Sequence, residues 1–114
     1  MQFDIQARNF SLTDALRQHA ERRLRFTFTC CRDQIQRVVM RLSDINGPRG
    51  GEDKRCHLQI KLDRLPDVIV EDTESDLYVA IDRASDRAGR TVMRKIERKQ
   101  SLLRQPAPAL LLPE

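Results

Sequence analysis

Aromatic residues and cysteines are scarce in this chain of 114 residues, which has no Trp, one Tyr, four Phe and three Cys. Since 4% of the residues are aromatic and 39% are hydrophobic, the core must be largely aliphatic. The cysteines do not form the disulfide framework of a secreted domain, because an odd number leaves one over and the adjacent Cys30 and Cys31 are poorly placed to bridge each other. We therefore expect a protein of the reducing cytoplasm.

Long hydrophobic runs are missing as well. No stretch approaches the roughly 18 apolar residues of a transmembrane helix. The first ten residues, MQFDIQARNF, lack the charged-then-apolar pattern of a signal peptide. We expect no membrane segment.

The motifs of catalysis and cofactor binding are not found. The sequence has no nucleophile motif, no glycine-rich phosphate loop and no paired-carboxylate arrangement. Cys56 and His57, together with Cys30 and Cys31, supply four possible metal ligands, but they lack the paired spacing of a zinc site. We therefore predict neither an enzyme nor a protein that needs a metal or cofactor.

Charge, in contrast, is abundant and unevenly distributed. The chain has 21 Lys and Arg against 17 Asp and Glu, a formal net charge of +4. Residues 67–76 contain five acids and no base, whereas residues 95–104 contain four bases and one acid. A basic surface beside an acidic one would orient the molecule on a nucleic acid.

The stretch from Asp76 to Lys99 carries two stripes at helical spacing. The apolar stripe consists of Leu77, Ile81, Ala84, Ala88 and Val92. The second stripe, turned by about 120°, consists of Arg83, Arg87, Arg90, Arg94 and Arg98. Arginines on one line repel each other and add nothing to a core, so either a polyanion or plain solvent faces them.

The first half of the chain predicts a strand and a helix. Residues 2–8 alternate between apolar and polar, which indicates a half-buried strand. Residues 11–25 have an apolar residue at every fourth position, with Thr13 as the N-cap, and thus indicate an amphipathic helix. Its basic residues are Arg17, Arg22, Arg23 and Arg25. We expect residues 26–34 to form a helix end and a connection with the aromatic side chains turned inward.

Three further strands precede the long helix. Residues 35–43 and 56–63 alternate, and a third apolar segment begins at Val68 and ends in acids. Residues 46–54, NGPRGGEDK, predict a mobile hairpin loop. The order β-α-β-β-β-α makes an α+β domain over residues 1–101, with a four-stranded mixed sheet and both helices on one face. Residues 102–114 are rich in Pro and Leu and predict a disordered tail, with a partner- or self-binding segment as the alternative.

Three stretches can be compared with known sequences: residues 7–17, the pair Arg23 and Leu24, and residues 76–82, DLYVAID. Together they resemble one known family, the ribosome hibernation-promoting factors, also called ribosome-associated inhibitor, protein Y or sigma-factor modulation proteins. The last stretch is similar to the family's acidic-apolar-Tyr-x-Ala-Ile pattern and is the most specific. The resemblance covers roughly residues 1–100. It does not include the C-terminal dimerisation domain that long members of the family carry, so it implies a short form of the family.

The resemblance implies a domain similar in layout to double-stranded RNA-binding domains. It would lie in the mRNA and tRNA channel of the small ribosomal subunit, contact ribosomal RNA through both helices, and silence idle ribosomes of bacterial cells under stress or in stationary phase. It implies no chemical step, no small-molecule substrate and a monomer when free. The RNA-contact role carries over to Arg8, Arg17, Arg23, Arg87, Arg90, Arg94 and Arg98. Arg22, Arg25 and Arg83 join them by helical geometry only.

Some residues have competing interpretations. We expect Tyr78 to pack with its hydroxyl at the edge rather than to contact RNA, and Asp82 and Asp86 to balance charge along their own helix. Because the four Phe fall in apolar registers, a platform for stacking single-stranded bases is not expected. Gly89 lies inside the long helix at a cost of up to ~1 kcal/mol, which predicts a less rigid helix.

A different class of function stays open. The acidic residues 67–76 or the apolar tail could bind another protein, with RNA binding incidental.

Overall fold

The computed structural model describes residues 2–44 and 54–104. Its elements are β1 (Gln2–Arg8), α1 (Asp14–Phe28), the 3-10 helix η1 (Thr29–Gln34), β2 (Ile35–Asp44), β3 (Lys54–Leu62), β4 (Val68–Glu74) and α2 (Leu77–Arg104). The predicted order β-α-β-β-β-α is confirmed, with η1 between α1 and β2.

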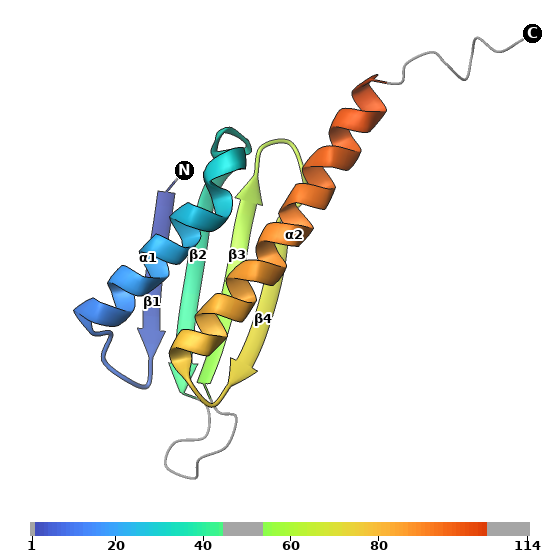
Figure 1. The fold of residues 1–114 in the computed structure, drawn as a ribbon. Helices are drawn as coiled ribbons and strands as arrows, with labels where there is room; N and C mark the ends of the chain where they lie inside the picture. Colours follow the sequence, from blue (N-terminus) through green and yellow to red (C-terminus); the bar gives the residue numbers. More distant parts are fainter. Residues whose placement is uncertain (1, 45–53, 105–114) are drawn as a thin grey trace, which may run out of the picture.

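The four strands form one mixed sheet in the order β1-β2-β3-β4. β1 and β2 are parallel, and the other two pairs are antiparallel. Both helices cover the same face of the sheet, α1 over β1 and β2, and α2 over β3 and β4 (Figure 1). The predicted α+β fold class is thereby confirmed.

The core lies between the sheet and the two helices and is mostly aliphatic, as expected. The predicted apolar stripe of α2 faces it, since Ile81, Ala84, Ala88 and Val92 are fully buried. Burying a side chain such as Ile81 contributes about 1.5–3 kcal/mol. Alternate residues of each strand complete this core, among them Ile5, Val38, Met40, Leu42, Cys56, Leu58, Ile60, Val68 and Val70.

Short polar side chains define where the helices begin. Thr13 caps α1, because its hydroxyl accepts a hydrogen bond of 3.2 Å from the backbone N–H of Leu16. Asp76 has the same role at α2 and accepts a hydrogen bond of 2.7 Å from the backbone N–H of Tyr78. Asn9, between β1 and α1, has a positive φ of 67°, a conformation that Asn tolerates better than most residues.

A series of contacts joins α1 to α2 along their length. The His19 Nε2 and Asp82 Oδ1 atoms lie 2.8 Å apart, and Arg23 pairs with Asp86. Beyond the end of α1, the thiol of Cys30 in η1 lies 3.7 Å from the sulfur of Met93 on α2. We call these contacts the helix seam. The two aspartates do balance positive charge, as predicted, but their partners lie on α1 and not along α2 itself.

Gly89 lies on this seam, beside Thr27. A Cβ atom at position 89 would be 2.6 Å from Cγ2 of Thr27, closer than two carbon atoms can pack. Close packing against Thr27 therefore explains why a glycine occupies position 89, even though glycine lowers helix propensity.

Phe26 corrects another expectation. α1 continues to Phe28. Residues two apart on a helix point about 200° away from each other, so only one of Phe26 and Phe28 can face the core. Phe28 is fully buried, whereas Phe26 is 76% exposed.

Two predicted boundaries shift. α2 continues past Lys99 to Arg104, and β3 begins at Lys54, within the predicted loop. The rest of that loop, residues 46–53, and residues 105–114 of the predicted tail lie outside the described residues.

Candidate nucleic-acid interface

The ten predicted arginines divide into two groups by their ion pairs. Three of them have carboxylate partners, namely Arg23, Arg83 and Arg87. Within residues 2–44 and 54–104, no carboxylate lies within ion-pair distance of the other seven, which are Arg8, Arg17, Arg22, Arg25, Arg90, Arg94 and Arg98.

The N-terminal half of α2 is neutralised by the acidic end of β4. Arg83 Nη1 lies 3.8 Å from Glu74 Oε2, and Arg87 Nη1 lies 4.0 Å from Asp72 Oδ1. Arg87 also donates a hydrogen bond of 2.7 Å to the backbone carbonyl of Glu71. The side chains of Asp72 and Glu74 are only 16% and 18% exposed. Two of the five acids of residues 67–76 therefore pair with arginines of α2.

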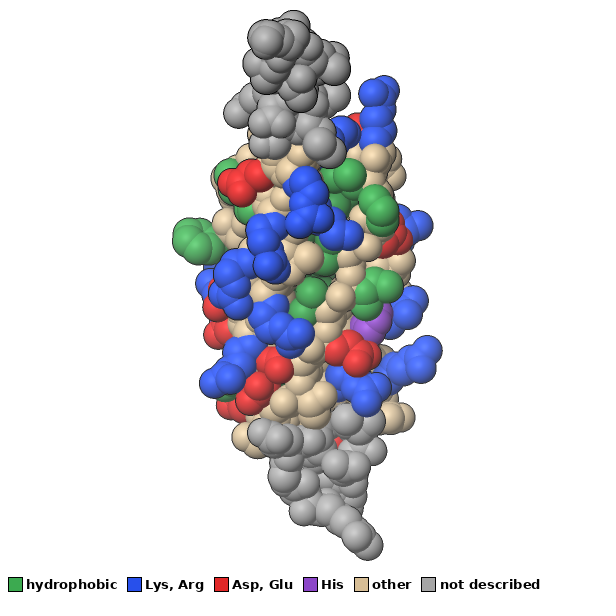
Figure 2. All heavy atoms as spheres, turned by 90° about the vertical axis from the view of Figure 1, so that its right-hand side faces the viewer, with side chains coloured by type: hydrophobic (Ala, Val, Ile, Leu, Met, Phe, Trp, Pro, Cys, Tyr) green, Lys and Arg blue, Asp and Glu red, His purple; other side chains and the backbone are tan. Residues whose placement is uncertain are grey.

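The C-terminal half of α2 keeps its positive charge. Arg90, Arg94 and Arg98 are exposed, and Lys95 and Lys99 of the same half are half-buried. Figure 2, which views the molecule from the side of α2 and β4, shows Lys and Arg side chains in a band along this face. We call Arg90, Arg94 and Arg98 the arginine row. The helical spacing sets these arginines along one line of α2, an arrangement that suits bidentate bonds to successive phosphates.

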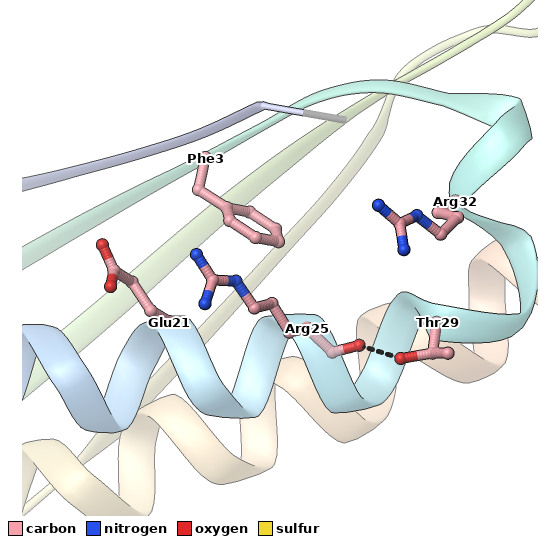
Figure 3. Close-up of a pocket in the computed structure, with 5 residues that line it drawn as sticks. All are labelled: Phe3, Glu21, Arg25, Thr29 and Arg32. Atoms are coloured by element: carbon pink, nitrogen blue, oxygen red, sulfur yellow. Dashed lines mark hydrogen bonds between the residues drawn. The ribbon is translucent and has the colours of Figure 1, made fainter.

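The arginines of α1 add to the basic surface, and one of them, Arg25, lines a pocket. The guanidinium carbon of Arg25 is 5.7 Å from the centre of the Phe3 ring, within cation–π distance. Figure 3 shows Arg25 beneath this ring and Arg32 of η1 reaching toward the same space. Arg32 was not among the predicted site residues, since its segment has no regular spacing.

Arg8 is separated from the other predicted residues. It lies at the end of β1 on the sheet face opposite the helices, where it lines a pocket with Arg41, Arg55, His57 and Glu71. The strand register brings these residues together, since Arg41 pairs with His57 and His57 with Glu71. The structure thus has a second basic cluster, which the outward positions of the strand alternation could have indicated.

The histidine and tyrosine near the start of α2 pack on each other. The rings of His19 and Tyr78 meet edge to face, with centroids 4.9 Å apart and an angle of 70°. Tyr78 stays 40% exposed, so its ring lies at the border of the helix seam.

The cysteines do not converge. Cys31 and Cys56 are buried, Cys30 is exposed, and His57 points to the other face of the sheet from Cys56. Burial, helped by the neighbouring Cys30, raises the pKa of Cys31 to about 11. Burial and the charge of Asp72 also raise the pKa of Cys56. Both thiols are therefore protonated at neutral pH. Within the described residues, no three His, Cys, Asp or Glu side chains are grouped to hold a metal ion.

A membrane-spanning helix is not found in the described part of the chain, where no helix combines the required length with the required hydropathy.

Comparison with known proteins identifies the family. Residues 3–100 match the family described as sigma 54 modulation protein / S30EA ribosomal protein. The chain belongs to this family and is a ribosome-associated protein. No curated protein matches it.

Two solved structures are similar. The N-terminal domain of Thermus thermophilus protein Y is 33% identical, with a TM-score of 0.66, and the match covers 82% of this chain and 98% of that one. A ribosomal subunit interface protein from Coxiella burnetii shares the fold at 18% identity, with a TM-score of 0.72, over 85% of this chain and 99% of that one.

Proposed function

We propose that this protein is a cytoplasmic translation inhibitor that binds ribosomal RNA of the small ribosomal subunit and occupies the path of mRNA and tRNA. It acts as a monomer, carries out no chemical step and holds idle ribosomes out of translation. The observation that carries the proposal is the arginine row, which lacks carboxylate partners in the described structure of a ribosome-associated protein.

Phosphate binding explains why the row is left unpaired. An internal carboxylate would have to be displaced before a phosphate could bind, as it would at Arg83 and Arg87. Each free arginine that contacts a phosphate also releases condensed counterions, which favours binding at low salt. Structured RNA is recognised mainly through its shape and backbone, so such a surface needs little base recognition.

The distribution of charge along α2 supports a defined orientation. Glu74 and Asp72 face its first turns, and the bare arginines follow. A polyanion is therefore attracted to the C-terminal half of α2 more strongly than to the neutralised N-terminal half.

Co-sedimentation with purified small subunits tests the proposal. The wild-type protein is expected to sediment with subunits at low salt, to dissociate steeply as salt rises, and to inhibit translation in vitro. Arg94→Glu is expected to weaken both effects. Lys61→Glu is the matched control, because it changes the net charge equally at an exposed position of β3, away from α2.

Equal losses in the two variants would mean that only net charge matters. No co-sedimentation of the wild-type protein at any salt concentration would refute the proposal. A pull-down with and without nuclease treatment distinguishes the proposed function from the protein-binding alternative. Non-ribosomal partners that stay bound after RNA digestion would favour the alternative.

A further inference from the structure

An open groove lies where the end of α1 meets the middle of α2. Phe26 and Thr27 form one side of it, and Gly89, Met93 and the first two arginines of the row form the other. Its volume of about 570 Å³ is within the range of roughly 300–1,000 Å³ common for ligand clefts.

The lining of this groove combines an unprotected aromatic ring with unpaired positive charge. Phe26 is the most exposed large hydrophobic side chain of the described residues, at 76%. Arg90 and Arg94 stand opposite it without carboxylate partners in the described structure. The groove also contains Asp86, whose carboxylate is already paired with Arg23. The free chemistry of the groove is therefore one aromatic face and two guanidiniums.

We propose that this groove binds an unpaired nucleobase of RNA, which stacks on Phe26 while its adjoining phosphates pair with Arg90 and Arg94. The inference rests on the proposed function and adds a specific contact to it. Every nucleobase has a flat face that can stack on an aromatic ring, and the negative phosphates on either side of the base can pair with the two positively charged arginines.

Charge complementarity favours this occupant over a second copy of the chain. Two copies joined through this groove would bring their unpaired arginines close together, and like charges repel. With one aromatic ring on this side, the groove suits a single base displaced from a structured RNA rather than a continuous single strand.

Fluorescence tests the stacking directly, because the chain has no Trp. F26W places a single indole in the groove, and we expect its emission to be quenched by a short oligouridylate. An abasic oligonucleotide of the same length supplies phosphates without bases and is expected to bind without quenching. The matched control is I69W on β4, where Ile69 is 61% exposed and outside the groove. Equal quenching of both variants, or none in F26W, overturns the proposal.

Affinity gives an independent test. Since Phe26 is exposed, F26A should melt like the wild-type protein. It is expected to bind the oligouridylate roughly tenfold more weakly, as the loss of one base–aromatic stack predicts, and the abasic oligonucleotide unchanged.

Small subunits separate this inference from the proposed function. If F26A binds them like the wild-type protein while Arg94→Glu does not, the base site is wrong and the proposed function stands. If F26A binds subunits more weakly but F26W is not quenched by RNA, a protein contacts the groove and the base site is again wrong. If the wild-type protein does not bind subunits either, the proposed function fails.

Discussion

Replacing Gly89 by alanine tests the packing of the helix seam. In an exposed helix this change stabilises by about 1 kcal/mol, because alanine has the higher helix propensity. Here the new methyl group would lie 2.6 Å from Cγ2 of Thr27. Thr27 is β-branched and held in a helix, so its side chain has little freedom to move aside.

The balance of these two effects predicts whether Gly89→Ala raises or lowers the free energy of unfolding. Overpacking a well-filled contact typically costs 1–3 kcal/mol. After subtracting the gain in propensity, Gly89→Ala should destabilise the protein by about 1 kcal/mol. For a domain of this size such a loss lowers the melting temperature by roughly 5 °C.

A double-mutant cycle assigns the loss to this contact. Thr27→Ala removes the obstructing methyl group, so Gly89→Ala in that background should be neutral or stabilising by up to about 1 kcal/mol. The free energy of unfolding in urea, followed by circular dichroism, measures all four proteins. If Gly89→Ala has the same effect with and without the Thr27 methyl group, the seam does not explain this glycine.

Three further changes have defined outcomes. Ile81→Ala should lower stability by about 2–5 kcal/mol, because it leaves a cavity under α2, and should weaken subunit binding with it; normal melting with impaired binding would contradict this. Asp86→Asn should lower stability by less than about 1 kcal/mol, since the pair with Arg23 is partly exposed, and should strengthen binding to RNA by removing a negative charge; weaker binding would argue against an RNA surface here. Stability should fall as pH rises from about 9 toward 11, because folded Cys31 keeps its proton up to a pKa of about 11 while the unfolded thiol loses it near 9.0. Cys31→Ala should reduce that decline, measured by urea unfolding at pH 8 and pH 10.5, and leave the part that comes from the buried Cys56; an unchanged decline would exclude Cys31 as a cause.

Local patterns were sufficient to predict most of the fold. The alternation in the strands placed residues such as Met40 and Leu58 in the core, since each strand has only two faces. Thr13 was recognised as a cap because capping needs only its own helix turn. The two stripes of α2 follow from helical spacing alone.

Features that depend on two elements could not be predicted in the same way. The pairing of Asp86 with Arg23 needs the relative position of two helices, which neither helix encodes by itself. Gly89 seemed a weakness for the same reason, because its neighbour Thr27 is distant in sequence. Phe26 was misplaced because the helix end lies later than the loss of periodicity suggested.

The candidate site shows the same limit. The arginine stripe was visible in the sequence, but its division into a neutralised and a bare half depends on where β4 ends beneath α2. Arg8 is far along the chain from the strand residues of its cluster, and only the sheet register brings them together.

The salt dependence of small-subunit affinity tests the central claim most directly. The logarithm of the binding constant should fall linearly with the logarithm of salt concentration, with a slope set by the number of phosphates contacted. If the arginine row binds phosphates, replacing Arg90, Arg94 and Arg98 by alanine should reduce the size of that slope by roughly 2–3. A slope that stays unchanged in this variant, at equal stability, would show that the row does not contact RNA.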